Sequence, residues 1–193
     1  MHPNFITKFF QNFIKDKDIR TFKNNYYYYL FFRLIRNFLN CYLEIKIYNF
    51  KILASNTKNK ISHALLKKCR FDDQSELKLI EKISKKNKIF LLDCGCNYGF
   101  YSFYTASLSS KNLVVAIEAS LTTVEDFKKN LNLNKFNNII LQNFAISDVD
   151  NTTITFNESQ NDWESSLIHS EFDEKKITKI KTQKIDTIIK NQK

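Results

Sequence analysis

Glycine is scarce in this sequence: the 193 residues include only two. A dinucleotide-binding fingerprint needs three glycines in the spacing G-x-G-x-x-G. If its first position is aligned with Gly95, the other two positions are Asn97 and Phe100. The fingerprint is therefore absent, which argues against a nicotinamide oxidoreductase.

Long apolar runs are also missing. The longest uncharged apolar stretch is Tyr26–Phe32, which Arg33 closes after seven residues, whereas a membrane-spanning helix needs about 20. Residues 1–14 carry no small-residue cleavage site, so no signal peptide is predicted. The four cysteines form no zinc-type C-x-x-C pair. We interpret them as reduced thiols and expect a cytoplasmic protein without a metal site.

Positive charge is concentrated at the N-terminus. Residues 1–70 hold 14 Lys/Arg against 3 Asp/Glu, and residues 71–193 hold 16 against 17. We therefore predict a basic, aromatic N-terminal extension over 1–70 and a second domain over 71–193. The extension either packs on that domain or contacts an anionic membrane surface. In the second case the protein would be a peripheral protein of the inner membrane face. Nucleic-acid binding is not expected, because the aromatics are bunched rather than interleaved with Lys and Arg.

The apolar pattern predicts an α/β fold. Before residue 88 it predicts a helix over 22–40, one or two strands over 42–53 and a helix over 72–84. From there strands and helices alternate, as right-handed βαβ units on a parallel sheet require. The predicted strands cover 89–92, 113–117, 138–146, 152–156 and 179–186, and the predicted helices cover 100–108 and 122–133. This order is that of a Rossmann-type doubly wound sheet.

Both glycines lie in one motif, Asp93-Cys94-Gly95-Cys96-Asn97-Tyr98-Gly99, where a strand ends and a helix begins. Gly95 would permit a tight turn and the close approach of a ligand, and Gly99 would permit close helix packing. A turn that binds nothing is the alternative. It explains the motif less well, because a plain turn needs one glycine and no flanking carboxylate.

The acidic-x-Gly-x-Asn-x-Gly pattern suits S-adenosylmethionine. This cofactor has no pyrophosphate but carries an ammonium group and a carboxylate. Asp93 suits the ammonium, and the main-chain amides of the loop suit the carboxylate. The next strand ends at Glu118, 23 residues beyond Gly95, where an acidic side chain can accept hydrogen bonds from both ribose hydroxyls. A solvated residue at the rim of the sheet is the alternative for Glu118.

Residues 88–156 resemble the FkbM family of S-adenosylmethionine-dependent methyltransferases. The matching motifs are Asp93 to Ser102, Glu118, Ala145-Ile146-Ser147-Asp148 and Ser165-Ser166-Leu167. The resemblance implies methyl transfer, often to a hydroxyl of a sugar or a glycan-linked acceptor. It also implies that the end of the third strand, from Asn143 through Phe144 to Ala145, lies near the adenine. The predicted cofactor-binding set is Asp93, Gly95, Asn97, Gly99, Glu118, Phe144 and Ala145.

The family continues with a further acidic strand after a segment like Ile185–Ile189, whereas this sequence stops at Lys193. We therefore expect an incomplete sheet, and a non-catalytic remnant is the alternative to an active enzyme. No catalytic residue is assigned. His169 could act as a base near neutral pH, but a lone histidine in a polar loop is usually a solvated one. The same holds for His63.

Overall fold

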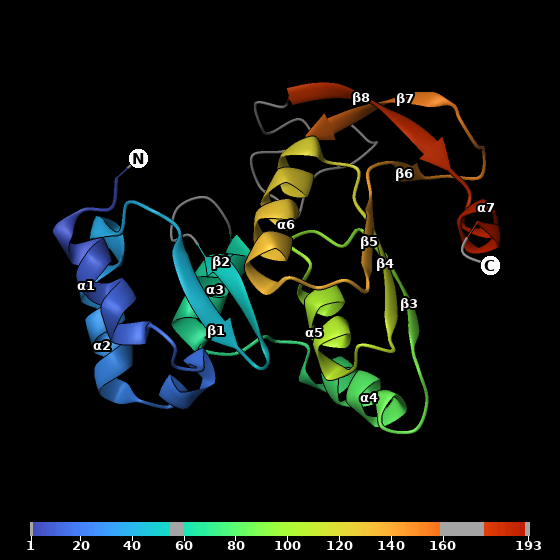
Figure 1. The fold of residues 1–193 in the computed structure, drawn as a ribbon. Coiled ribbons are helices and arrows are strands. Elements are labelled where there is room, and N and C mark those ends of the chain that lie inside the picture. Colours follow the sequence, from blue (N-terminus) through green and yellow to red (C-terminus); the bar gives the residue numbers. More distant parts are fainter. Residues whose placement is uncertain (1, 55–59, 159–175, 192–193) are drawn as a thin grey trace.

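The computed structural model describes residues 2–54, 60–158 and 176–191, in which an N-terminal part lies beside an α/β part (Figure 1). The N-terminal part contains α1 (Phe5–Ile14), α2 (Tyr26–Ile35), β1 (Leu43–Ile47), β2 (Phe50–Ala54) and α3 (Lys60–Lys68). The α/β part contains α4 (Gln74–Ser84), β3 (Phe90–Cys94), α5 (Phe100–Leu108), β4 (Leu113–Ile117), α6 (Leu121–Asn134), β5 (Ile139–Gln142), β6 (Ala145–Ile146), β7 (Thr153–Glu158), β8 (Lys176–Gln183) and α7 (Ile185–Lys190).

Three parallel strands form the central sheet in the order β3-β4-β5. The side chains of β4 alternate between two apolar clusters. Val114 and Ala116 belong to the large core shared with the helices, whereas Val115 and Ile117 pack with Phe144. A parallel strand that is buried on both faces has to be apolar throughout. The predicted α/β fold with a parallel sheet is confirmed.

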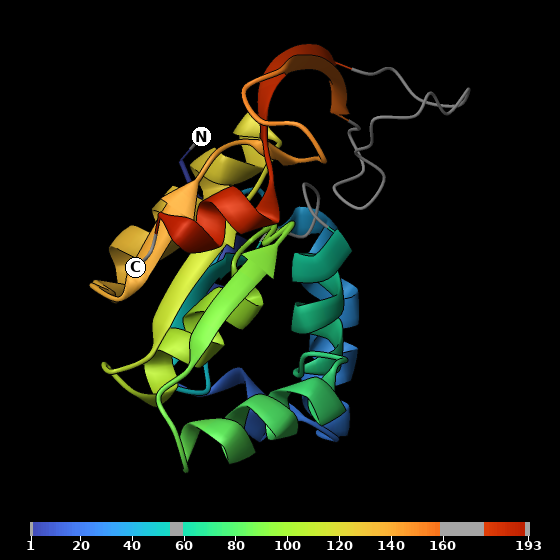
Figure 2. The same ribbon diagram turned by 90° about the vertical axis from the view of Figure 1, so that its right-hand side faces the viewer.

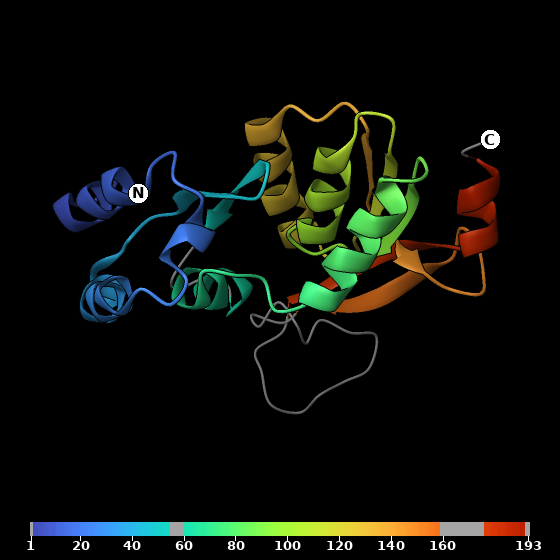
Figure 3. The same cartoon turned by 90° about the horizontal axis from the view of Figure 1, so that it is seen from below.

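Helices lie on both sides of this sheet. In Figures 1 and 3, α4, α5 and α6 lie on one side and α7 on the other. Phe103 of α5 and Phe127 of α6 are fully buried, with ring centroids 4.8 Å apart. Ile188 of α7 packs against the opposite face, and Figure 2 shows this helix in front of the sheet. Within the described residues, β3 has a partner strand on one side only.

The strand predicted over 138–146 divides into β5 and β6, which belong to different sheets. Asn143, between them, explains the division. Its Nδ2 donates to the carbonyl oxygens of Glu118 (2.8 Å) and Ala119 (3.2 Å). These bonds hold the chain at the end of β4, and β6 then pairs with β8 instead of continuing beside β4.

The strand predicted over 179–186 is β8, and it ends earlier than expected, at Gln183. Asp150 explains the end, because its carboxylate accepts from Lys184 N (2.7 Å) and from Thr187 Oγ1 (2.7 Å). These bonds satisfy donors at the first turn of α7. The strand predicted over 152–156 is β7, which pairs antiparallel with β8.

The N-terminal part holds more helix than predicted. The helix expected over 22–40 begins only at Tyr26, where Asn25 Oδ1 caps the Tyr28 amide at 2.9 Å. Neither α1 nor α3 was predicted. The expected strand region over 42–53 is the hairpin β1-β2. Among the helices of the described ranges, none combines the length and apolar content of a membrane span.

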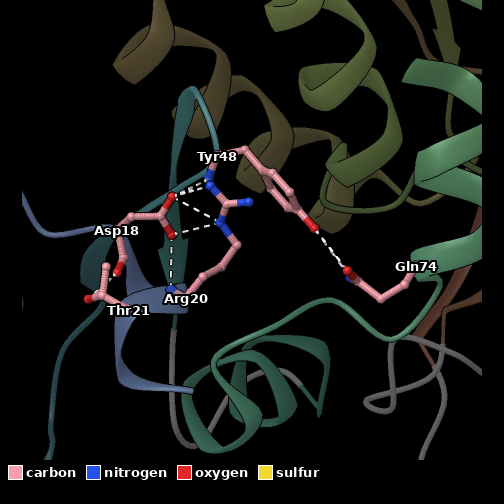
Figure 4. A network of polar contacts seen from close by, with 5 residues as sticks. All are labelled: Asp18, Arg20, Thr21, Tyr48 and Gln74. Carbon is pink, nitrogen blue, oxygen red and sulfur yellow. Dashed lines mark hydrogen bonds and ion pairs between the residues drawn. The ribbon is translucent and has the colours of Figure 1, made fainter. Parts of the chain in front are cut away.

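A polar network joins the N-terminal part to the start of α4 (Figure 4). Asp18 accepts from Arg20 Nη2 (2.6 Å) and from Tyr48 N (3.1 Å). The Arg20 guanidinium lies 3.8 Å from the centroid of the Tyr48 ring. The Tyr48 hydroxyl accepts from Gln74 Nε2 (3.2 Å), which also donates to Phe71 O (2.6 Å). The network therefore fixes the segment that precedes α4.

Candidate functional site

The two glycines of the β3–α5 loop have different surroundings. Both have positive φ, 74° at Gly95 and 83° at Gly99, which favours glycine. A Cβ at Gly99 would lie 2.6 Å from Phe103 Cε2 and would also overlap the Phe127 ring. A Cβ at Gly95 would have no atom within 4 Å outside its immediate neighbours. Gly99 is thus a packing residue, whereas Gly95 faces open space.

The amides of this loop are used within the protein. Those of Gly95 and Cys96 both donate to Ile117 O at 2.9 Å, and that of Gly99 donates to Cys96 O at 2.8 Å. The Asn97 amide donates to Glu118 Oε2 at 3.0 Å. Three of these four amides donate to carbonyl and carboxylate oxygens at the neighbouring end of β4. That the amides of the loop hold a cofactor carboxylate stays a prediction.

Asp93 lies near the end of β3, beside the loop. Its Oδ2 accepts from Ser102 Oγ at 2.6 Å, and Ser102 is fully buried in α5. Burial raises the pKa of Asp93, and the Ser102 hydrogen bond opposes the rise. Ser102 was part of the recognised motif but was not predicted as a site residue. The structure shows that it fixes the orientation of this carboxylate.

Glu118, directly after β4, is buried with 9% of its surface exposed. Its Oε2 accepts from Asn97 N, and its Oε1 accepts from Ser120 N at 2.9 Å. Burial raises the pKa of Glu118, and the backbone N–H donors oppose the rise. The Ala119 amide acts on this carboxylate as well, so three backbone donors share its roughly four lone-pair sites and one site is left. Glu118 therefore braces the glycine loop and keeps capacity for a ligand.

A cavity of about 370 Å³ opens beside the loop, here called the β3 cavity. Asp93, Gly95 and Asn97 line it together. Its opposite wall is the segment 70–73 with Tyr101, which sequence reasoning missed because no motif marks it. This wall is fixed by two contacts. The Phe71 and Phe100 rings stack at 3.7 Å, and the Tyr101 hydroxyl donates to Asp73 Oδ2 at 2.6 Å.

The other predicted site residues lie outside the lining of this cavity. Gly99, the last residue of the loop, faces Phe103 and Phe127 instead of the cavity. Glu118 is linked to the cavity lining through the Asn97 amide. Phe144 is buried against Val115 and Ile117, and Ala145 belongs to β6. Their proximity to an adenine stays a prediction. His169 and Ser165-Ser166-Leu167 lie outside the described residues, as does the side chain of His63 in α3.

A second, more open groove of about 480 Å³ runs between the start of α2 and the end of α3, here called the α2–α3 groove. Its lining combines tyrosines, asparagines and basic residues, namely Asn24, Asn25, Tyr26, Tyr29, Lys67 and Lys68. Arg70 lines both this groove and the β3 cavity. The two spaces are therefore neighbours.

Comparison with known families identifies the fold that carries this loop. Residues 60–159 match the model of the methyltransferase small domain. The chain belongs to this family. The match includes α4, the central sheet, the glycine loop and Glu118. The methyltransferase fold expected from the sequence is therefore confirmed, while the narrower FkbM assignment stays a prediction.

Solved structures give more distant matches. The SAM-dependent methyltransferase from Agrobacterium tumefaciens is 12% identical, with a TM-score of 0.41 over 53% of this chain and 32% of that one. M. jannaschii TYW2 in complex with AdoMet is 23% identical, with a TM-score of 0.44 over 58% and 48%. P. horikoshii TYW2 in complex with MeSAdo is 13% identical, with a TM-score of 0.41 over 68% and 64%. The chain thus spans less than two thirds of each structure. A comparison with curated proteins found no match.

Proposed function

We propose that this methyltransferase domain binds S-adenosylmethionine in the β3 cavity and transfers its methyl group to an acceptor. The observation that carries the proposal is the open side of Gly95 beside the half-buried carboxylate of Asp93. A volume of about 370 Å³ falls within the roughly 300–1,000 Å³ of small-molecule sites. Because Gly95 has no side chain and no near neighbour, a ligand can approach the backbone there.

The charges around the β3 cavity match those of the cofactor. Asp93 would hold the ammonium group, with its orientation set by Ser102. The exposed Arg70 is the cation of this wall that can pair with the cofactor carboxylate. Asp73 adds negative charge, which favours the cationic sulfonium, whereas the charge of Asp72 is paired with Lys68 at 2.5 Å. Glu118, Phe144 and Ala145 lie outside the lining of the β3 cavity. A cofactor that extends from the cavity past the glycine loop to the end of β4 would place its ribose hydroxyls at Glu118 and its adenine near Phe144 and Ala145, as the FkbM resemblance implies.

The acceptor we propose is a hydroxyl of a saccharide or glycan-linked molecule, again as that resemblance implies. The sulfonium is an activated methyl donor: as the carbon–oxygen bond forms, the carbon–sulfur bond breaks and S-adenosylhomocysteine leaves as a neutral thioether. The hydroxyl proton passes to water. Positioning can then supply much of the rate. The α2–α3 groove supports this acceptor, because tyrosine rings and asparagine amides suit sugar rings and hydroxyls and the groove adjoins the β3 cavity through Arg70.

Cofactor identity is tested by calorimetric titration with S-adenosylhomocysteine and with NAD. We expect tighter binding of S-adenosylhomocysteine. Glu118→Ala should weaken it by about 10- to 100-fold, the loss expected for one or two charge-assisted hydrogen bonds. Glu125→Ala is the matched control, because Glu125 is an exposed residue of α6 paired with Lys128. Tighter NAD binding, or equal losses from the two substitutions, would refute the proposal.

The acceptor is tested by S-adenosylhomocysteine release with a panel of saccharides. Tyr26→Ser, in the α2–α3 groove, should raise the KM for the accepted sugar and leave cofactor affinity unchanged. Tyr27→Ser is its control, because Tyr27 is not part of the groove lining. Turnover with non-saccharide acceptors alone would exclude the sugar while leaving methyl transfer in place.

A further inference from the structure

The outward side of α2 is apolar although much of it is exposed. Tyr26, Leu30 and Leu34 follow one another at intervals of four residues and so share one side of the helix. They are 68%, 39% and 64% exposed. Tyr27, next to them, is 81% exposed. A surface helix normally places polar residues on its outer side, so this pattern requires an explanation.

The core does not need these residues. The inward side of α2 is occupied by Tyr28 and Phe32, which are 3% and 2% exposed. The Tyr28 hydroxyl donates to Leu66 O at 2.8 Å and so fixes α2 on α3. The outer apolar residues are therefore additional to the packing of the helix.

The neighbouring helix α1 has the same character. Thr7, Phe10 and Ile14 are buried on its inner side, whereas Phe5 and Phe9 are 82% and 54% exposed. Phe9 lies 6.1 Å from Phe31 of α2, so the two helices are adjacent. Both form the end of the molecule farthest from α7 (Figures 1 and 3). We call the exposed residues Phe5, Phe9, Tyr26, Tyr27, Leu30 and Leu34 the outer face.

Cations accompany the outer face. Residues 1–38 contain 7 Lys/Arg and 2 Asp/Glu. Lys8 is exposed between Phe5 and Phe9, and Arg33 is exposed next to Leu34. One of the two acidic residues, Asp18, is already paired with Arg20 at 2.6 Å. The positive charge beside the outer face is thus largely uncompensated.

We propose that the outer face docks on the surface of an anionic lipid bilayer, with α1 and α2 lying in the interface. Tyrosine and phenylalanine suit the boundary between acyl chains and headgroups, and Lys8 and Arg33 match anionic headgroups. A second copy of the chain fits less well. A symmetric dimer would place the same patch on itself, so these cations would face like charges. The inference rests on the exposure of α1 and α2 and not on methyl transfer itself, although Tyr26 belongs both to the outer face and to the lining of the α2–α3 groove.

The test is co-sedimentation of the full chain with vesicles of phosphatidylcholine alone and of phosphatidylcholine with phosphatidylglycerol. We expect binding only to the second kind, weakening as salt rises. Leu34→Gln should lower the apparent affinity for these vesicles, measured from the bound fraction, by about tenfold or more. The matched control is Leu79→Gln on α4, because Leu79 is 59% exposed but lies outside the outer face.

A charge variant gives a second, independent readout. Arg33→Glu should weaken binding to the anionic vesicles by roughly tenfold. Lys78→Glu is the control, because Lys78 is exposed on α4, outside the outer face, and should leave binding unchanged. Equal binding to both vesicle types, or equal losses from Leu34→Gln and Leu79→Gln, would overturn the proposal. Sedimentation velocity that shows a dimer abolished by Leu34→Gln would assign the face to a second copy instead.

Titration with S-adenosylhomocysteine separates these outcomes from failure of the methyltransferase site. We expect cofactor affinity to be unchanged in all of these variants.

Discussion

At the scale of single residues, the contrast between the two glycines separates folding from binding. Gly99 has no room for a Cβ, because Phe103 and Phe127 fill the space. Gly95 has room, yet its φ of 74° is one that other residues rarely adopt. The same residue type is thus used once for core packing and once for the approach of a ligand.

Alanine substitutions should reveal this difference. Gly99→Ala should cost roughly 1–3 kcal/mol from overpacking and about 1–2 kcal/mol more from the left-handed backbone. Gly95→Ala carries only the backbone cost, but its methyl group enters the β3 cavity and should weaken S-adenosylhomocysteine binding strongly. Denaturant unfolding and calorimetry measure the two effects. If Gly95→Ala lost more stability than Gly99→Ala, this assignment of roles would be wrong.

Protonation of Asp93 should control cofactor affinity. Affinity for S-adenosylhomocysteine is expected to fall as the pH drops through the raised pKa of Asp93, because a neutral carboxyl no longer attracts the ammonium group. Ser102→Ala removes a hydrogen bond that lowers this pKa, so the loss should begin at a higher pH. Ser107→Ala is the control, because Ser107 Oγ donates only locally, to Tyr104 O at 2.8 Å. Identical pH profiles for the two variants would contradict the role of Ser102.

The raised pKa has the opposite consequence for stability. A carboxyl with a higher pKa in the folded state binds its proton more tightly there. Its contribution to stability is therefore lost as the pH rises from the unfolded pKa, about 3.9, through the folded one. At neutral pH the charge on Asp93 should thus destabilise the fold. Asp93→Asn is expected to raise the midpoint of urea unfolding at neutral pH and to weaken cofactor binding, and a lower midpoint would disprove the first expectation.

At the scale of elements, α6 meets the free edge of strand β2 through two asparagines. Asn130 Oδ1 accepts from Leu53 N at 2.8 Å, and Asn134 Oδ1 accepts from Lys51 N at 2.7 Å. Asn134 Nδ2 also donates to Lys51 O at 2.7 Å. These amides take the place of a neighbouring strand and satisfy backbone groups that an edge leaves unpaired.

Loss of the Asn130 amide should therefore destabilise the fold. Asn130 is fully buried, and its Nδ2 also donates to Tyr98 O in the glycine loop at 3.3 Å. Asn130→Ala leaves the Leu53 amide and the Tyr98 carbonyl without this partner, at about 1–3 kcal/mol for each buried group. Asn132→Ala, on the exposed side of α6, should change stability by less than about 0.5 kcal/mol. Thermal unfolding of both variants tests this, and similar midpoints would exclude the role of Asn130.

Elements with a strong local signal could be predicted from the sequence. The apolar run Leu113–Ile117 predicted the bounds of β4, and the glycine loop predicted the first residue of α5. Boundaries set by distant side chains could not be predicted. The break between β5 and β6 depends on Asn143 bonding to the end of β4, and the end of β8 depends on Asp150, 34 residues from Lys184.

The site was predictable only where one motif holds it. Asp93, Gly95 and Asn97 are close in sequence and line one cavity. The opposite wall, with Arg70 and Phe71, comes from the segment before α4 and reaches the cavity through tertiary packing. A single sequence holds no signal for such a wall, because its residues are ordinary for a helix start and acquire their role only when Phe71 stacks on Phe100.

At the scale of the whole molecule, one apolar core extends across the predicted boundary at residue 70. The cluster that contains Phe10 and Ile45 of the N-terminal part also contains Phe103 and Val114 of the α/β part. Phe50 makes the link, with its ring 5.2 Å from Phe100 and 6.0 Å from Phe103. The division into domains 1–70 and 71–193 remains a prediction. Both predicted domains contribute residues to this one core.

The two parts are expected to unfold as one unit, and Phe50→Ala is the variant that tests this. Phe50 is 2% exposed, so the substitution should cost about 3–5 kcal/mol. In a single cooperative unit this loss lowers the free energy of opening everywhere. Native-state hydrogen exchange should then show equal losses of protection for the amides of α1 and of β4, which lie on opposite sides of residue 70. Phe5→Ala is the control, because Phe5 is 82% exposed and should leave both sets unchanged. Loss of protection confined to residues 1–70 would show instead that the basic extension is a separate domain docked on the methyltransferase fold.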